Sequence, residues 1–254
     1  MTTSYTNSLS PRERFRFTAR FSEQAELFAD MLDAMKNLLA LTSTLTAEER
    51  ELLAVAYTGV TQPRRTAWQA LGKLIAKEEP KGNTEQLALL RKRRVGLETE
   101  LSQIYQEIIN FIDTKLVPSG DFEADVFYLT MKGNYYAHMC EYTSGADQFA
   151  ARDKSTKAYM AGQIIAEKNL SATHPVRLSV IFRFAELYYN YFGDPAKAHS
   201  VAKLAFDDAI ADIDKCLEEH YNLSTSIMDK MRNRMTVWKS ELESSEIIDE
   251  ESGS

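Results

Sequence analysis

Apolar residues recur at steps of three and four along most of the chain, the spacing that places side chains on one face of an α-helix. Caps and breakers divide this pattern into segments: Ser10-Pro11 opens the first, and Thr46 with Glu49 forms a capping box that opens the longest, which contains Pro63 and is expected to kink there. The predicted helices cover residues 11–41 (two short helices or one bent one), 46–77, 84–116, 122–142, 148–169, 175–192, 196–217 and 224–239.

The segment from Val126 to Glu141 combines two faces. One face is apolar and can be buried in the core. The other brings polar residues together at three- and four-residue steps, a set consisting of Thr130, Asn134, Ala137, His138 and Glu141. A polar face in a mostly helical chain lines a groove or meets solvent, and the pattern alone leaves both open.

No segment reads as a strand, and Gly (10) and Pro (6) are scarce in the 254 residues, which favours long helices. We therefore predict an all-α fold of about nine mostly antiparallel helices, without a fixed internal repeat. The predicted organisation is a flexible N-terminus over residues 1–11, one domain over 12–240 and a disordered acidic tail over 241–254.

Composition narrows the class of protein. A net charge of -7 argues against general nucleic-acid binding. The two cysteines, Cys140 and Cys216, have no metal-ligand spacing, so we expect free thiols, no metal and no cofactor. No apolar run reaches the length of a membrane span and no signal peptide is evident, so we expect a cytoplasmic protein, with the nucleus as a second location.

The chain shows no phosphate-binding glycine loop, zinc-protease motif or nucleophile elbow, and its histidines are dispersed. An enzyme is therefore the less favoured class. A binding face is better supported, because Thr58, Thr61, Arg65 and Gln69 share one side of the predicted 46–77 helix. The guanidinium of Arg65 suits an anion, although an arginine on a polar helix face is usually solvated.

Several segments, in order, resemble the signature blocks of the 14-3-3 family: LTAEERELLAVAYTGVTQPRRTAW, VFYLTMKGNYYAHMCEY, THPVRLSVIFRFAELYY, AKLAFDDAIADID and STSIMDKMRNRMTVW. The resemblance extends from about Arg14 to Trp238. It implies a cup-shaped protomer of nine helices, usually dimeric. It also implies a non-catalytic adaptor or scaffold that holds phosphoserine or phosphothreonine client segments in an amphipathic groove.

The same resemblance implies that the phosphate pocket is atypical. Arg65 matches one arginine of the family's pocket. Thr58 stands where the family has a lysine, Ala137 where it has a second arginine and His138 where it has a tyrosine. Each charge-assisted hydrogen bond contributes about 1.5–3 kcal/mol, so these losses correspond to about 2–4 decades of affinity. The groove positions are Thr58, Arg65, Gln69, Lys132, Ala137, His138, Phe182, Arg183, Asn190, Ser226, Ile227, Lys230 and Arg234.

Two interpretations of these substitutions stay open. In the first, a weakened pocket is re-sited around Arg65, Arg183 and Arg234. In the second, the chain is a phosphorylation-independent subunit that heterodimerises with, and modulates, a phosphopeptide-competent 14-3-3 paralogue. The acidic tail could also occupy the groove as an intramolecular anion, or remain solvated.

The resemblance also implies a dimer interface, at Phe21, Leu27, Phe28, Asp30, Arg93 and Glu100. Leu27 stands where the family has the arginine that pairs with Glu100 of the partner, and Gly96 stands where it has the lysine that pairs with Asp30. Because exposed ion pairs contribute little, we expect Phe21, Leu27 and Phe28 to pack instead. Homodimer and heterodimer both remain open.

Overall fold

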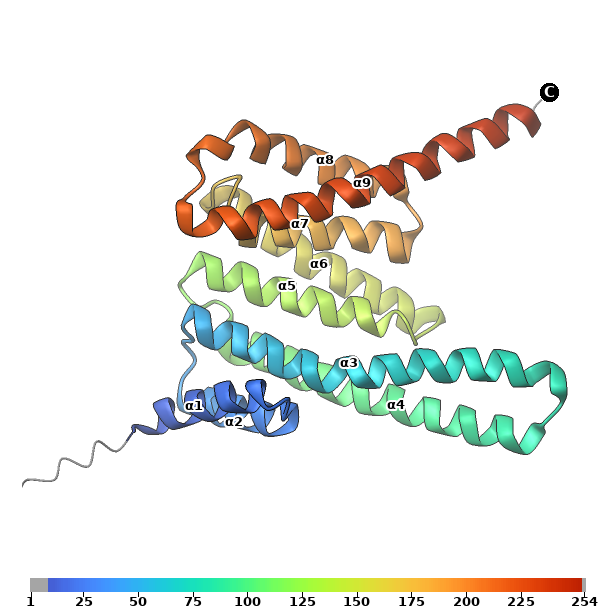
Figure 1. Cartoon of the computed structure of the whole chain (residues 1–254), viewed down its shortest axis with the longest axis horizontal. Helices are drawn as coiled ribbons and strands as arrows, with labels where there is room; N and C mark the ends of the chain where they lie inside the picture. The colour runs from blue at the N-terminus through green and yellow to red at the C-terminus, as the bar shows by residue number, and fades with distance from the viewer. Residues whose placement is uncertain (1–8, 253–254) are drawn as a thin grey trace, which may run out of the picture. The chain divides into compact units, whose positions relative to one another are not determined.

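The computed structural model describes residues 9–252, with side chains described for residues 9–244. Within these residues every regular element is helical and no strand occurs (Figure 1), so the predicted all-α class is confirmed. The nine α-helices are Pro11–Gln24 (α1), Phe28–Leu41 (α2), Ala47–Glu78 (α3), Thr84–Phe111 (α4), Phe122–Met139 (α5), Gly145–Asn169 (α6), Pro175–Leu187 (α7), Pro195–Ala211 (α8) and Glu218–Ser252 (α9). Short helical segments follow α3, α4, α7 and α8: the 3₁₀ segments Glu79–Lys81 (η1) and Ile213–Lys215 (η4) and the π segments Ile112–Leu116 (η2) and Tyr188–Phe192 (η3).

The predicted helix starts at Ser10 and Thr46 are confirmed, because both residues form complete capping boxes. The first predicted segment is two helices rather than one bent helix. The chain breaks at Glu26, whose φ of 56° lies in the left-handed region, which a helix cannot continue through.

The long helix α3 continues through Pro63. In an α-helix the carbonyl of residue 59 accepts a hydrogen bond from the N–H of residue 63. Proline has no N–H, so the carbonyl of Gly59 lacks that helical donor.

The last helix differs most from its predicted bounds, since α9 spans Glu218–Ser252 instead of residues 224–239. The tail predicted to be disordered from residue 241 is therefore helical as far as Ser252. Lys239 Nζ lies 3.5 Å from Glu243 Oε1, four residues further along the helix, and this ion pair supports the extension. Residues 253–254 and residues 1–8 of the predicted flexible N-terminus lie outside the described part of the chain.

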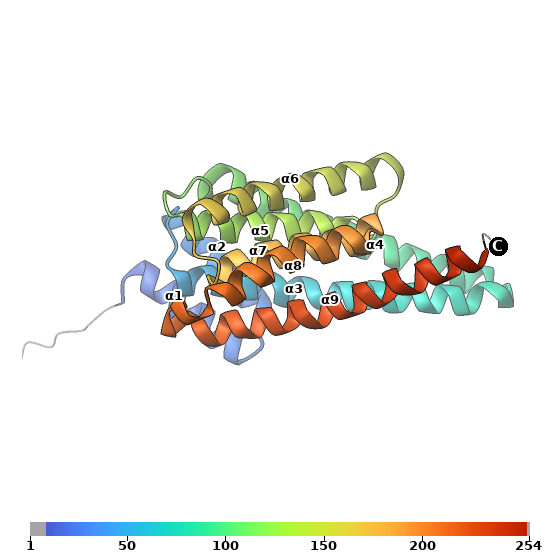
Figure 2. The same cartoon turned by 90° about the horizontal axis from the view of Figure 1, so that it is seen from above.

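Contacts divide the chain into two compact units, residues up to Asn110 and residues from Phe111 onward. In the first unit, α1 packs on α2 and α2 on α3. Helices α3 and α4 lie side by side (Figures 1 and 2) and are joined by hydrogen bonds from Tyr57 Oη to Glu107 (2.8 Å) and from Trp68 Nε1 to Glu98 (2.7 Å). The prediction of one domain over residues 12–240 stays a prediction.

In the second unit, α5 and α6 pack closely because α5 carries Gly133 at the contact. A Cβ at Gly133 would lie only 2.6 Å from the ring of Tyr159 on α6. The hydroxyl of Tyr159 donates to Asn134 Oδ1 at 2.7 Å, so this buried tyrosine is both packed and satisfied. Helices α7, α8 and α9 complete the core of this unit around Trp238.

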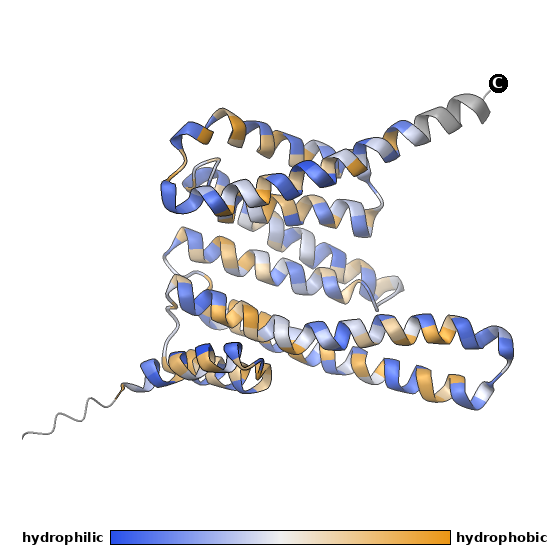
Figure 3. Cartoon of the chain, in the orientation of Figure 1, coloured by the Kyte–Doolittle hydropathy of each residue, from blue (hydrophilic) through white to orange (hydrophobic). Residues whose placement is uncertain are grey.

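Hydrophilic and hydrophobic residues alternate along the helices (Figure 3), as amphipathic helices require. Across the described residues, no helix combines the length and apolar character needed to cross a bilayer.

Candidate functional site

The first unit carries three predicted groove positions, all on α3. Thr58 and Gln69 are exposed and Arg65 is half-buried. Arg65 Nη1 donates to the side-chain carbonyl of Gln62 at 3.4 Å, so the guanidinium lies beside the preceding turn of the same helix. The neighbouring Arg64 binds Glu100 on α4 instead, at 2.9 Å. Of these two adjacent arginines, only Arg65 shares the helix face of Thr58 and Gln69.

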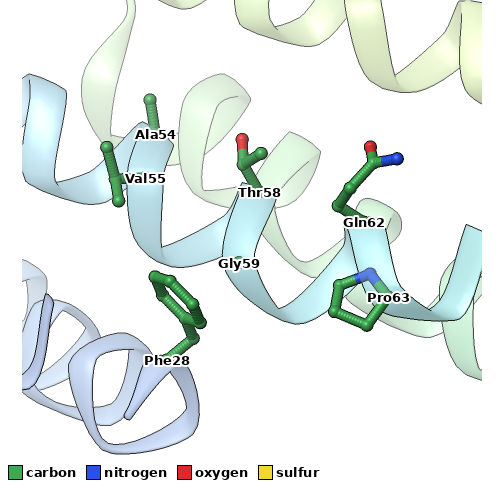
Figure 4. Close-up of a pocket in the computed structure, with 7 residues that line it drawn as sticks. All are labelled: Phe28, Ala54, Val55, Thr58, Gly59, Gln62 and Pro63. Atoms are coloured by element: carbon green, nitrogen blue, oxygen red, sulfur yellow. The ribbon is translucent and has the colours of Figure 1, made fainter. Parts of the chain in front are cut away.

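An apolar pocket of about 450 Å³ opens on the same helix (Figure 4). We name it the Phe28 pocket. Its lining residues, all in the first unit, are Phe28, Ala54, Val55, Thr58, Gly59, Gln62 and Pro63. The predicted groove residue Thr58 and the predicted dimer residue Phe28 therefore line one pocket, a relationship that sequence spacing did not reveal.

On α5 of the second unit, two positions that the resemblance assigns to the phosphate pocket are Ala137 and His138. Ala137 is buried, and the His138 ring lies 6.3 Å from that of Tyr135, edge to face. The nearby cation Lys132 forms an ion pair with Asp113. The carboxylate of Asp113, in the same unit, therefore partly neutralises the charge of Lys132.

The polar face of α5 proves to be used largely within the second unit. Thr130 donates to the carbonyl of Val126 at 2.7 Å, and Asn134 accepts from the buried Tyr159. Glu141 accepts from Tyr191 Oη at 3.0 Å. The bond of Thr130 lies within α5, that of Asn134 ties α5 to α6, and that of Glu141 ties the turn after α5 to η3. A groove function need not explain those polar residues.

The second unit does bring two predicted groove residues together, Arg183 on α7 and Arg234 on α9. Both guanidiniums face one carboxylate, Glu186: Arg183 Nη1 lies 2.8 Å from Oε2, and Arg234 Nε lies 3.9 Å from Oε1. We call these three residues the arginine–glutamate cluster. Its side chains are partly exposed, at 52% for Arg183, 32% for Arg234 and 23% for Glu186, so an external anion can reach it.

Arg234 has a second set of contacts. Its guanidinium carbon lies 4.9 Å from the ring centroid of Tyr189 and 5.3 Å from that of Trp238. Such cation–π contacts attract a guanidinium to the faces of aromatic rings. Tyr189 Oη in turn donates to Glu241 at 2.7 Å, and this hydrogen bond to a carboxylate raises the pKa of Tyr189.

The remaining predicted groove positions of the second unit fall into two groups. Phe182 is buried and packs in the core, whereas Ile227 is half-buried. The exposed positions are Asn190, Ser226 and Lys230.

Glu186 is the residue that sequence reasoning missed. The Arg183-x-x-Glu186 spacing was visible, and in a helix it predicts a pair on one face. The approach of Arg234 from another helix was not visible, because it depends on how α7 and α9 pack.

The dimer positions are all in the first unit. Phe21, Leu27, Asp30 and Arg93 are exposed, while Phe28 turns toward Gly59. Glu100, expected to face a partner, is bound within its own chain by Arg93 and Arg64, each at 2.9 Å. These two hydrogen bonds, that of Arg93 first, lower the pKa of Glu100.

Metal and thiol chemistry find no support among the described residues. No group of three or more His, Cys, Asp or Glu there is arranged to hold a metal ion. Cys140 is buried, which raises the pKa of its thiol to about 11 and keeps it protonated at neutral pH.

Known proteins resemble this chain over nearly its whole length. A model of the 14-3-3 protein family matches residues 18–239. The 14-3-3-like protein GF14 epsilon of Arabidopsis thaliana is 42% identical over 91% of each chain, and the 14-3-3-like protein C of Glycine max is 41% identical over 92% of each. The 14-3-3 protein 7 of Solanum lycopersicum is 40% identical over 91% of this chain and 92% of its own. The chain therefore belongs to the 14-3-3 family, whose members are non-catalytic adaptors that bind phosphorylated client proteins and dimerise.

Proposed function

We propose that this protein is a 14-3-3 adaptor and scaffold that binds client segments in an amphipathic groove, with a weakened, re-sited pocket for an anionic side chain. The observation that carries the proposal is the arginine–glutamate cluster of the second unit. Two guanidiniums from different helices converge there on one carboxylate.

A guanidinium binds carboxylate and phosphate oxygens through the same fork of N–H donors. The position held by Glu186 between Arg183 and Arg234 is thus chemically suited to an anion. With all three groups ionised, the cluster has a net charge of +1, because two cations face one anion. A client phosphate or carboxylate would gain the two guanidiniums at the cost of displacing Glu186, which weakens the pocket without abolishing it.

Arg65 enters this proposal from the family resemblance alone, as the one retained cation of the family's pocket. The other positions support weak rather than strong phosphate binding. Thr58 and Ala137 carry no charge, and Lys132 is already paired with Asp113. This groove can therefore bind clients phosphorylated on Ser or Thr and also unphosphorylated clients.

The second candidate function is a structural subunit that heterodimerises with a phosphopeptide-competent paralogue. One specific observation favours it: Arg234 is engaged by Glu186 and by two aromatic rings. An arginine held in this way can be a packing residue and nothing more.

Titration with a matched pair of client peptides, phosphorylated and unphosphorylated, separates the two functions. We expect tighter binding of the phosphorylated peptide, and Arg183→Gln should remove most of that preference. Arg65→Ala tests the contribution assigned to Arg65.

The matched control is Arg232→Gln, because Arg232 forms a similar exposed pair, with Asp229, three residues away on α9. Equal affinity for both peptides, or equal loss in Arg183→Gln and Arg232→Gln, would reject the re-sited pocket. Formation of a mixed dimer with a phosphopeptide-binding 14-3-3 protein, without peptide binding by this chain, would establish the second function.

A further inference from the structure

The shape of the Phe28 pocket in the first unit follows from the residues that line it. Gly59 presents no side chain, and the ring of Phe28 from α2 lies against it (Figure 4). A Cβ at Gly59 would lie 2.2 Å from two atoms of that ring, so only glycine allows this approach. Ala54 and Val55 lie on one side of Gly59 and Pro63 on the other, which leaves an apolar hollow (Figure 4).

The proline in α3 removes one helical hydrogen bond beside the pocket. The carbonyl of Gly59 points along α3 toward Pro63, which has no N–H to offer. A volume of about 450 Å³ lies within the range of pockets that hold large apolar groups.

A cation borders the pocket. Gln62 lines it, and Arg65 Nη1 lies 3.4 Å from the Gln62 side-chain carbonyl. Along the helix axis, Gly59 and Arg65 are separated by about 9 Å, at about 1.5 Å per residue. An extended peptide covers that distance in about three residues.

We propose that the Phe28 pocket anchors an aromatic side chain of an unphosphorylated client segment, with a carboxylate within about three residues of it that reaches Arg65. The proposal rests on the proposed function in two respects, because it takes client segments as ligands and uses Arg65 as the cation that receives their anion. It assigns the first unit an anchor that requires neither phosphorylation nor the arginine–glutamate cluster.

Fluorescence anisotropy with labelled peptides tests this on the full chain. The probe is an unphosphorylated peptide in which Phe is followed three residues later by Glu. Its controls are the same peptide with Ala for Phe, with Gln for Glu, and with both Ala for Phe and phosphoserine for Glu. We expect the first substitution to weaken binding by about tenfold, the scale of one buried aromatic side chain, and the second by about threefold.

Two protein variants with matched controls locate the site. Ala54→Phe fills the pocket and should reduce binding of the probe by about tenfold, whereas Ala76→Phe, an exposed alanine on the same helix, should not. Arg65→Gln should remove the preference for Glu over Gln, whereas Lys73→Gln should keep it. Thermal unfolding establishes that each variant is folded, and Val55→Asn provides a second pocket variant if Ala54→Phe is not.

Binding of the probe that survives both pocket variants would overturn the proposal. So would tighter binding of the phosphoserine peptide that lacks Phe. Arg183→Gln distinguishes the aromatic anchor from the proposed function. This substitution should weaken the binding of phosphopeptides and leave the binding of the Phe-containing probe unchanged.

Discussion

The ring of Phe28 lies directly on the backbone of Gly59, so close that a Cβ at residue 59 would lie 2.2 Å from the ring. This contact joins α2 to α3 and shapes the pocket between them. Glycine in a helix interior normally costs about 1 kcal/mol relative to alanine. Here the close packing of an aromatic ring explains its presence.

Gly59→Ala should therefore destabilise the protein by about 1–3 kcal/mol, because the ring has to move. In a Phe28→Ala background the same substitution should instead stabilise by about 0.5–1 kcal/mol, since only helix propensity remains. Urea unfolding of the four proteins of this double-mutant cycle measures the difference. An equal effect of Gly59→Ala in both backgrounds would show that the ring is not the constraint.

The buried hydroxyl of Tyr159 provides a second test, in the core of the second unit. Tyr159→Phe removes the donor to Asn134 Oδ1 and should cost about 1–2 kcal/mol, because the amide oxygen loses its partner. Tyr221→Phe, at a tyrosine that is 48% exposed, should change stability by less than about 0.5 kcal/mol. Similar values for the two variants would contradict the structural role assigned to this hydrogen bond.

Glu186→Gln tests the arginine–glutamate cluster by removing its negative charge. Removing the carboxylate leaves two guanidiniums without a competing charge, so affinity for a phosphorylated client peptide should rise about two- to fivefold, the scale of a partly exposed ion pair. Isothermal titration calorimetry measures the change. Asp229→Asn, which removes the negative charge paired with Arg232, is the matched control and should have no such effect. Unchanged or weaker binding in Glu186→Gln would mean that no client anion replaces this carboxylate.

If this chain dimerises as its family does, the interface should depend on apolar contacts more than on ion pairs. Glu100 already binds Arg64 and Arg93 of its own chain, so Glu100→Gln should change the dimer dissociation constant less than about threefold. Phe21→Asp should shift it by more than about tenfold, because half-exposed Phe21 is a candidate for burial there. Sedimentation velocity at low and high ionic strength measures both, and a dimer that dissociates at high salt would contradict the prediction.

The N-cap of α7 predicts a pH dependence of stability. His174 Nδ1 accepts from the N–H of Val176 at 3.3 Å, which requires the neutral ring. Burial first, and then the neighbouring His220, lowers the pKa of His174, against the opposing effect of Glu123. The unfolded chain therefore binds a proton more readily than the folded chain. The stabilising contribution is complete above the unfolded-state pKa of about 6.5 and is lost as the pH falls through that value toward the folded-state pKa.

Urea unfolding at about pH 7 and about pH 5 measures this contribution. His174→Asn keeps a capping side chain but cannot titrate, so it should lose less stability on acidification than the unsubstituted protein. His199→Asn controls for the general effect of removing a histidine. An identical pH dependence in all three proteins would exclude His174 as the responsive group.

Local patterns in the sequence predicted that the chain is helical and where several helices begin. Ser10 and Thr46 determine where α1 and α3 begin, because a capping side chain acts on backbone groups within three residues of it. The same reasoning placed Arg65 and Thr58 on one face of α3, since helical spacing is a local property. It did not predict the end of α9, which continues past residue 239 into a segment whose composition suggested disorder.

Only the tertiary structure decided what the side chains do. The contacts of Arg234 with Glu186 and of Phe28 with Gly59 each join residues that are distant in sequence, and they depend on how two helices pack. The polar face predicted between Val126 and Glu141 left a groove and solvent both open. In the structure, Asn134 and Glu141 bind Tyr159 and Tyr191 of neighbouring elements. Periodicity determines which residues share a face. What that face meets depends on the packing of the whole unit.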